Sequence, residues 1–481
     1  MTTHAPAAPL AALAVPARSR ALALAVLCAG MLMIILDGSI VTVALPAIQE
    51  DLGFSPSGLT WTVNAYLIAF GGLLLLAGRL GDLIGRKRVF VAGLAVFTAA
   101  SLLCAVATSP GLLIGARFLQ GVGGALASSV SLGMIVTLFP EPRERGRAIG
   151  AFSFVGAAGA SIGQVLGGVL TQALNWHWIF LINLPLGIAA ALLAVRVLES
   201  ERGPGLRAGA DALGAALITA ALMLGVYTIV GTGEHGWASA RTLGLGALAV
   251  ALLAGFLWHE GRAAHPLLPL RMFRSRNVSG ANLVQVLTIS GMFGFQILVA
   301  LYLQNVLGYG AAATGLAMLP AAVAIGAVSL LLSARLSARF GERRVLLAGL
   351  ALLVAALGLL ARLPADADYA VHLLPTMLLV GGGGLVLSTL AVLGMSGAGP
   401  DDAGAASGLF NTTQQIGGAL GVAVLTTLAD GRTATLAAAG QAGADALADG
   451  FRLAFGIAAG LLTAALLVAA TVLKSTATEE N

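Results

Sequence analysis

The sequence has very little charge for its length. Only 10% of its 481 residues are Asp, Glu, Lys or Arg, whereas a typical soluble domain carries about 25%. So few charged side chains do not cover the surface of a protein of this size in water. The composition therefore excludes an ordinary soluble globular protein.

Cysteine is also scarce. Cys28 and Cys104 are the only two, and both fall within long apolar segments, so neither a disulfide framework nor a metal-ligand cluster is indicated. The sequence has no GxxxxGK[ST] phosphate loop and no HExxH zinc motif. We therefore expect neither an enzyme nor an ATP-driven pump, and no bound metal or cofactor.

Apolar sequence fills the chain instead. Hydrophobic residues make up 58% of it, and the mean hydropathy is +0.95. Its apolar runs of about 20 residues suit membrane-spanning helices and are too continuous for barrel strands, which alternate between two faces. We expect an all-α integral membrane protein with fourteen transmembrane helices. Their approximate ranges are 21–45, 58–77, 89–107, 111–138, 147–171, 178–196, 211–231, 241–258, 278–303, 314–334, 344–362, 371–394, 403–428 and 452–473.

Basic residues are unevenly distributed between the loops. With the N-terminus placed inside, the cytoplasmic segments hold 21 Lys and Arg residues and the opposite side holds 4. Because such residues concentrate in cytoplasmic loops, we expect both termini to be cytoplasmic. The net charge of +5 is scattered over these loops and forms no single face for nucleic acid.

An internal repeat divides the chain. GRLGDLIGRKR at 78–88 is matched by ARLSARFGERR at 334–344, and LGFSPSGL at 52–59 parallels LGYGAAATGL at 307–316. Parallel repeats are typical of transporters that bind their substrate midway through the membrane, between the two halves. We expect two six-helix bundles, made of the first six and the last six spans, with the seventh and eighth spans as an inserted pair.

These spans set the expected divisions of the chain. An Ala/Gly-rich loop outside the membrane is expected at 429–451. The divisions are a cytoplasmic tail at 1–20, the N-terminal bundle at 21–200, the inserted pair with cytoplasmic linkers at 201–276, the C-terminal bundle at 277–473 and a second cytoplasmic tail at 474–481.

Two charged residues lie well inside the apolar spans. Asp37 is about 17 residues into the first span, where a charge costs about 2.5–3.5 kcal/mol on insertion scales. A buried carboxyl can take up and release protons, and a structural carboxylate bonded to neighbouring helices is the alternative. Arg117 either tunes such a carboxyl or binds substrate, or it snorkels to the outer interface. We expect proton coupling at these two residues.

The segment 78–88 reads as a basic loop between the second and third spans. Gly85 permits a tight reversal, and Asp82 can pair with Arg86 or face a helix N-terminus. An ordinary positive-inside loop is the alternative, but the partial repeat favours a conformational role. In the repeat, Ala338 stands where Asp82 stands. The residues assigned to this loop are Gly78, Asp82, Gly85, Arg86, Lys87 and Arg88.

Small and polar residues complete the set of candidates. Glycines on one face of the fifth span suit close packing against another helix. Polar and aromatic side chains within other spans either line a cavity or bind helix to helix. The residues of the span-five motif are Gly159, Gly163, Gln164, Gly167 and Gly168. The candidates for a substrate cavity are Asn64, Tyr66, Asn282, Gln285, Asn411 and Gln415.

Taken together, these motifs resemble those of the major facilitator superfamily, and in particular its fourteen-span drug:proton antiporter branch. In the branch, the span-five motif usually reads GxxxGPxxGG, and here Gln164 replaces the proline and any kink that it causes. The resemblance covers nearly the whole chain and rests on LDGSIVTVALPAI at 36–48, WTVNAYLIAFG at 61–71, GRLGDLIGRKR at 78–88, RFLQGVGGA at 117–125, WHWIFLINLPLG at 176–187 and DALG at 211–214.

The resemblance implies a function as well as a fold. It implies export of hydrophobic drug-like or antibiotic compounds, coupled to protons by alternating access, across the cytoplasmic membrane of a bacterium. The expected partners are the lipid bilayer, protons and a small hydrophobic or monocationic substrate. We expect a monomer that needs no cofactor because the proton gradient drives it. A uniporter or importer of a small metabolite, or a membrane scaffold or sensor that transports nothing, are the alternatives.

Overall fold

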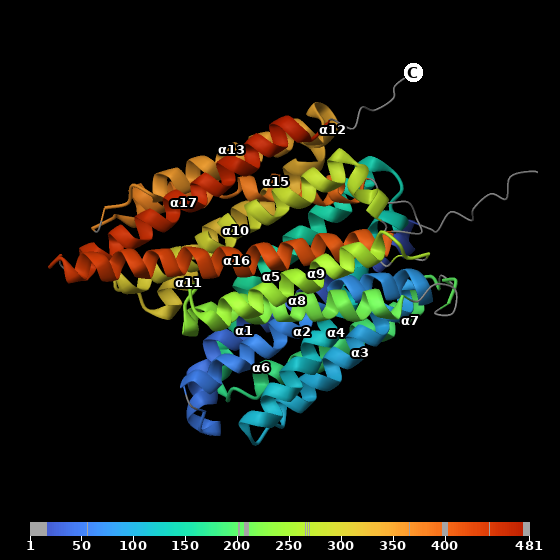
Figure 1. Cartoon of the computed structure of the whole chain (residues 1–481), viewed down its shortest axis with the longest axis horizontal. Helices are drawn as coiled ribbons and strands as arrows, with labels where there is room; N and C mark the ends of the chain where they lie inside the picture. The colour runs from blue at the N-terminus through green and yellow to red at the C-terminus, as the bar shows by residue number, and fades with distance from the viewer. Residues whose placement is uncertain are drawn as a thin grey trace, which may run out of the picture.

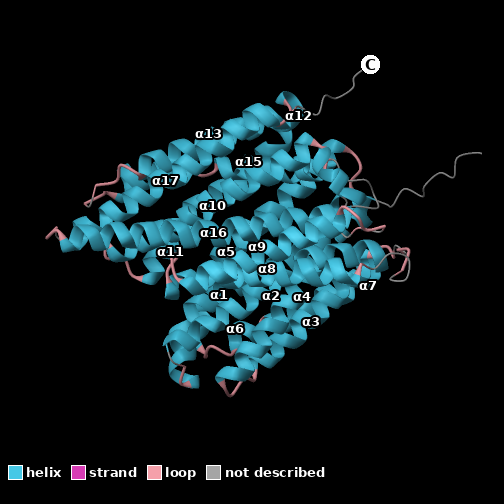
Figure 2. Cartoon of the chain, in the orientation of Figure 1, coloured by secondary structure: helices cyan, strands magenta, loops and turns pink. Residues whose placement is uncertain are grey.

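Within the described ranges, every regular element of the computed structural model is a helix, and no strand occurs there (Figure 2). The all-α class is therefore confirmed. Residues are described over 17–54, 56–200, 203–205, 211–264, 266, 268, 270–364, 366–396, 403–441 and 443–474.

The first seven helices pack mainly against one another, with α3 on α4, α2 on α4 and α1 on α5. They are α1 (Ala17–Leu52), α2 (Pro56–Ile84), α3 (Arg86–Ala105), α4 (Pro110–Leu138), α5 (Pro142–Ala173), α6 (Trp178–Leu181) and α7 (Asn183–Val197). Local sequence sets the start of α4, where the Ser109 hydroxyl accepts a hydrogen bond from the amide of Leu112 and a proline follows. The sixth expected span is a short helix followed by a longer one rather than one continuous helix.

Helices α8 (Ala212–His235) and α9 (Ala240–Glu260) form a pair of their own. Asp211 and Ser239 cap their N-termini by accepting hydrogen bonds from backbone amides. Because α8 packs against both α2 and α16, the pair lies between the first and last groups of helices, in green in Figure 1.

The remaining helices form a second group, in which α10 packs against α16 and α17. They are α10 (Arg276–Asn305), α11 (Ala311–Ala327), α12 (Ala334–Phe340), α13 (Glu342–Leu360), α14 (Leu374–Leu379), α15 (Gly382–Met395), α16 (Ala403–Ala438) and α17 (Gly443–Val472). A short 3-10 helix, η2 (Leu270–Arg274), and two short π-helical segments, η3 (Val328–Ser333) and η4 (Tyr369–Leu373), adjoin them.

The prediction of a loop at 429–451 is wrong. Helix α16 continues to Ala438, and α17 already begins at Gly443. Alanine is the best helix former, so an Ala-rich segment continues a helix rather than ending it. The break falls instead at Gly440, whose φ of 86° is left-handed.

Twelve helical segments among the described residues are long and apolar enough to cross a membrane. The expected count of fourteen is not confirmed, because α5 and α16 are not among the twelve. Helix α16 is rich in Gly, Ser, Thr and Gln. These residues lower the hydropathy of a helix that packs largely against other helices.

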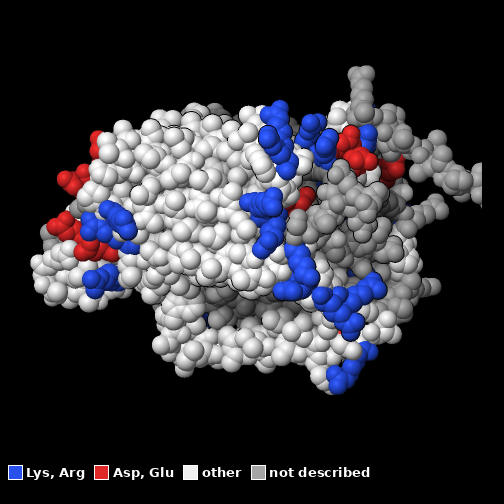
Figure 3. Space-filling view, turned by 90° about the horizontal axis from the view of Figure 1, so that it is seen from above, with Lys and Arg blue, Asp and Glu red and all other residues white. Residues whose placement is uncertain are grey.

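The surface agrees with a membrane environment. Large apolar side chains point outward, such as Leu192 at 60% exposed and Val250 at 66%. On the face shown in Figure 3, a broad belt without charged side chains separates two charged ends, and most of the Lys and Arg residues lie on one side of the belt. Helix α1 begins and α17 ends towards the same end of the molecule (Figure 1).

Candidate functional site

A buried ion pair joins α1 to α4. Arg117 donates from Nη1 to Oδ2 of Asp37 at 2.5 Å, and the two side chains are 1% and 0% exposed. The other carboxylate oxygen, Oδ1, accepts hydrogen bonds from Gln120 at 2.7 Å and from Asn183 at 2.9 Å. Three donors from two other helices thus hold the carboxylate, which is the condition for keeping a charge in a dry interior.

Arg117 is held on its other sides as well. Its Nε donates to the carbonyl oxygen of Thr62 at 3.0 Å, and its Nη1 also donates to Gln120 at 2.5 Å. The guanidinium lies 4.4 Å from the centre of the Tyr66 ring, a cation–π distance. Snorkelling to the interface, the alternative considered for Arg117, is therefore wrong. Tyr66 packs on this arginine and does not line the cavity described below.

Sequence reasoning missed Gln120, Asn183 and Ser101 of this cluster. Ser101 accepts a hydrogen bond from Gln120 at 2.8 Å. Gln120 carried a usable signal, because it is three residues after Arg117 and so shares its helix face. Asn183 lies 146 residues from Asp37 in the chain, and only the packing of α7 against α1 brings the two together.

The glycines of α5 lie against the part of α1 that carries Asp37. A Cβ atom at Gly163 would lie 2.1 Å from Ser39 Oγ and 2.7 Å from the Leu36 carbonyl oxygen. One at Gly167 would lie 2.8 Å from the carbonyl oxygen of Ile40. Side chains at these positions would separate the helices, so the glycines permit the close approach.

The other two glycines of this motif contribute less to the contact. A Cβ at Gly159 would meet Leu32 at 3.1 Å, and one at Gly168 would only touch Val43, at 3.9 Å. The side chain of Gln164 lies outside the described residues.

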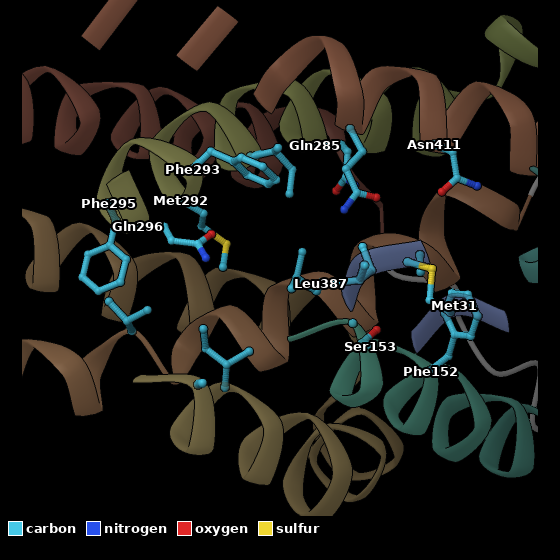
Figure 4. A pocket seen from close by; sticks show the side chains of 18 of the residues that line it. Met31, Phe152, Ser153, Gln285, Met292, Phe293, Phe295, Gln296, Leu387 and Asn411 are labelled. Atoms are coloured by element: carbon cyan, nitrogen blue, oxygen red, sulfur yellow. The ribbon is translucent and has the colours of Figure 1, made fainter. Parts of the chain in front are cut away.

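A cavity of about 230 Å³ lies between the two groups of helices. Helices α1, α4 and α5 form one wall, and α10, α11, α15 and α16 form the other (Figure 4). Its lining is mostly aliphatic, aromatic and methionine side chains, and none of the described lining residues is charged. Met31 and Ile35 of α1 belong to the lining, so the cavity comes within two residues of Asp37 along that helix.

Only two of the six polar or aromatic candidates line this cavity. They are Gln285 and Asn411. Asn282 instead donates to the carbonyl oxygen of Val278 at 2.9 Å and accepts from Thr413 at 3.0 Å. Asn64, Tyr66 and Gln415 lie outside the lining as well. Which face of a helix meets a cavity depends on helix rotation, and the sequence does not specify it.

A second contact between the groups lies where α2 meets the start of α16. The Asp82 carboxylate accepts hydrogen bonds from the amides of Gly404 and Ala405, at 2.9 and 2.8 Å, and from Arg86 at 3.1 Å. Helix N-termini leave such amides unpaired and favour negative charge. A Cβ at Gly78 would lie 2.4 Å from the carbonyl oxygen of Gly404, so the two helices touch here through their backbones.

The loop expected at 78–88 is helical except for Gly85, which has a φ of 100° and joins α2 to α3. Lys87 donates to the carbonyl oxygens of Val195 and Leu198 near the end of α7, and Arg88 is exposed. In the second copy of the repeat, Gly341 takes the same place with a φ of 80°. The repeat in the sequence is thus a repeat of backbone geometry.

Comparison with known proteins identifies the family. The model of the Major Facilitator Superfamily matches residues 27–422. The cephamycin export protein CmcT of Amycolatopsis lactamdurans is 42% identical, with 84% of each chain covered. The puromycin resistance protein pur8 of Streptomyces alboniger is 39% identical, over 92% of this chain and 90% of its own. The tetracenomycin C resistance and export protein of Streptomyces glaucescens is 36% identical, over 82% and 73%.

Solved structures show the same fold. The human organic anion transporter MFSD10 superposes with a TM-score of 0.68 at 16% identity, over 94% of this chain and 99% of its own. The transporter FucP, solved in the outward conformation, gives a TM-score of 0.64 at 16% identity, over 95% and 100%. The resemblance inferred from the sequence motifs is therefore confirmed, and this chain is a multi-pass membrane transporter of the Major Facilitator Superfamily.

Proposed function

We propose that this transporter exports hydrophobic, antibiotic-like compounds from a bacterial cell in exchange for protons. The observation that carries the proposal is the fully buried Asp37–Arg117 pair, on the same helix as residues of a central apolar cavity. An ionisable group inside the membrane marks a proton or substrate pathway by default. The relatives named for export or resistance to puromycin, cephamycin and tetracenomycin C support the substrate class.

The proposed arrangement in the membrane has fourteen spans. Helices α5 and α16 are 32 and 36 residues long, which at about 1.5 Å per residue exceeds a hydrocarbon core of about 30 Å. Helices α1–α7 form one six-span bundle, α10–α17 form the other, and α8 and α9 are the inserted pair. Both termini are cytoplasmic, as the distribution of Lys and Arg indicates, and one chain suffices because the cavity lies within it.

The proposed coupling passes through α1. In the conformation described, Arg117 donates a hydrogen bond to Asp37, and Asp82 accepts hydrogen bonds from the start of α16; in the proposed mechanism the second contact keeps the cytoplasmic side closed. A proton arriving at Asp37 removes its charge and so loosens the hold on Arg117. Because α1 also lines the cavity and packs closely on α5, a change at Asp37 reaches both walls of the substrate site. Alternating access then follows from rocking of the two bundles.

A drug-accumulation assay tests this function. The chain is expressed in a bacterial host that lacks its own efflux pumps, and uptake of puromycin, a cephamycin and tetracenomycin C is measured with and without a protonophore. Lower accumulation of at least one compound, reversed by the protonophore, is expected. Export that persists in the protonophore would instead favour a uniporter, and no effect on any compound would favour a membrane protein that transports nothing.

A further inference from the structure

The buried side chain of Gln285, on the wall of the cavity, has no hydrogen-bond partner among the described residues. Gln285 on α10 is 1% exposed, yet neither its Oε1 nor its Nε2 forms a hydrogen bond with any residue that the structure describes. Burying an amide without partners is costly, so such groups are rare in folded proteins. The unpaired amide of Gln285 therefore needs an explanation.

A shortage of partners in this part of the protein is not the reason. Asn282, one turn earlier on α10, uses its amide nitrogen on the Val278 carbonyl and its oxygen on Thr413. Asn411, across the cavity lining, donates to the carbonyl of Ser407 at 2.9 Å. The amide nitrogens of Asn282 and Asn411 are therefore bonded to the protein, whereas both polar atoms of Gln285 are available to a ligand.

The carboxamide of Gln285 points into the cavity. Figure 4 shows it entering from α10, with Ser153 of α5 pointing in from the opposite wall. Phe152, Met31 and Phe293 are among the side chains around this space. A compound there meets large apolar and aromatic surfaces and a small number of neutral hydrogen-bonding groups.

The same lining disfavours a charged compound. None of its described residues carries a charge, and Asp37 already accepts hydrogen bonds from Arg117, Gln120 and Asn183. A cation in the cavity would lose its hydration and find no carboxylate to replace it, which is strongly unfavourable.

We propose that Gln285 recognises uncharged substrates that present a hydrogen-bond donor beside an acceptor, as primary amides and lactams do. The carboxamide of Gln285 would accept one hydrogen bond and donate another to that edge, while the apolar walls hold the rest of the molecule. This inference rests on the proposed function, because it takes the cavity as the substrate site. The sequence led us to expect a hydrophobic or monocationic substrate. The proposal limits this expectation to uncharged compounds.

Equilibrium binding to the purified full chain in lipid nanodiscs tests the proposal. The probe is tritiated naphthamide, with N,N-dimethylnaphthamide, which lacks the donor, and naphthylmethyl-trimethylammonium, a cation of similar shape, as competitors. Two paired hydrogen bonds predict that the wild type binds naphthamide at least about tenfold more tightly than the dimethyl compound. The cation is expected not to compete.

Two variants assign this preference to the residue. Gln285→Met keeps the volume of the side chain but removes both polar atoms, so the preference for naphthamide over the dimethyl compound should disappear. Gln415→Met makes the same change on α16 outside the cavity lining and should leave the preference intact. Absence of naphthamide binding to the wild type, equal binding of the two amides, or an unchanged preference in Gln285→Met would each overturn the proposal.

The melting temperature of the protein without ligand shows whether Gln285 serves ligand recognition or the stability of the fold. If Gln285 is reserved for a ligand, Gln285→Met should leave the melting temperature unchanged or raise it, because it removes an unpaired buried amide. A lowered melting temperature would mean that Gln285 serves the fold, through bound water for example, and would contradict the proposal. Binding is measured without a proton gradient, so failure of proton-driven export would not change this result, and export could persist if Gln285 proved unselective.

Discussion

The guanidinium of Arg117 contacts the carboxylate of Asp37 at 2.5 Å, although the two residues are 80 positions apart in the chain. Neither side chain is more than 1% exposed. An isolated charge at this depth in a membrane protein would be costly. Because the two charges are opposite and in contact, each lowers the cost of burying the other. The pair therefore fixes α1 against α4 for as long as both residues stay charged.

Arg117→Met should strongly destabilise the protein. The substitution leaves Asp37 buried with only neutral donors, and removing one partner of a buried pair typically costs about 3–5 kcal/mol. The melting temperature of the purified protein, followed by tryptophan fluorescence, should fall accordingly. The double variant Asp37→Asn, Arg117→Met serves as the control, because it removes both charges and should recover much of the loss. A double variant as unstable as the single one would show that the cost does not come from the unpaired carboxylate.

Gly163→Ala should loosen the packing of α1 on α5. The new methyl group would lie 2.7 Å from the backbone oxygen of Leu36, so one helix has to move. Such overpacking typically costs about 1–3 kcal/mol, measured as the change in free energy of unfolding. Gly168→Ala is the matched control, since its methyl group would lie 3.9 Å from Val43 and should change stability by less than about 0.5 kcal/mol. Equal effects of the two changes would remove the special role of Gly163.

Asp82→Ala should open the side of the protein where α2 meets α16. The carboxylate accepts two backbone amides at the start of α16, and losing such charge-assisted bonds typically costs about 1.5–3 kcal/mol. That difference shifts a two-state equilibrium by about 10- to 150-fold. Spin labels on cysteines at Glu141 and Ala338, in a protein without its two native cysteines, should report longer distances. Arg88→Ala, a change at an exposed residue of the same segment, should leave the distances as they are.

The inserted pair of helices should lose stability in acid. Burial raises the pKa of Asp211, but hydrogen bonds from the Gly214 amide and from His259 help to outweigh it and leave the pKa below its ordinary value of 3.8. A lowered pKa stabilises the folded state above the unfolded value, and the gain is lost as pH falls through the folded value. Acid titration of stability below pH 3.8 should therefore show this loss.

Asp211→Ala supplies the comparison for that titration. The variant should be less stable at neutral pH by about 1 kcal/mol, the usual cost of losing a helix cap, and its stability should depend less on pH in the acid range. Parallel titration curves for the variant and the wild type would show that Asp211 is not the titrating group.

Much of the fold follows from the sequence because membrane helices are encoded locally. Helices occupy each of the expected apolar ranges, and the two charged residues within spans, Asp37 and Arg117, proved to contact each other. The glycines of α5 were also predicted to pack closely against another helix, which is α1. Length, hydropathy and the high cost of an isolated charge in lipid suffice for these predictions.

The remaining features depend on information that no single segment contains. Whether Asn282 or Gln285 faces the cavity is decided by the rotation of α10, and the role of Asn183 by the packing of α7 on α1. Hydropathy also fails for α16, whose polar and glycine-rich sequence is accommodated by neighbouring helices. A loop beyond 428 does not follow from the Ala/Gly-rich composition, because Ala and Gly have opposite effects on helices.

Transport by Asp37→Asn in reconstituted proteoliposomes tests the proton-coupling role most directly. The substrate is the compound that the accumulation assay identifies, and two rates are measured. They are accumulation driven by an imposed pH gradient and exchange of labelled for unlabelled substrate without a gradient. Asparagine keeps the shape of the side chain but cannot release a proton, so gradient-driven accumulation should vanish while exchange continues. Gradient-driven accumulation at the wild-type rate in Asp37→Asn would contradict the assignment of proton coupling to this residue.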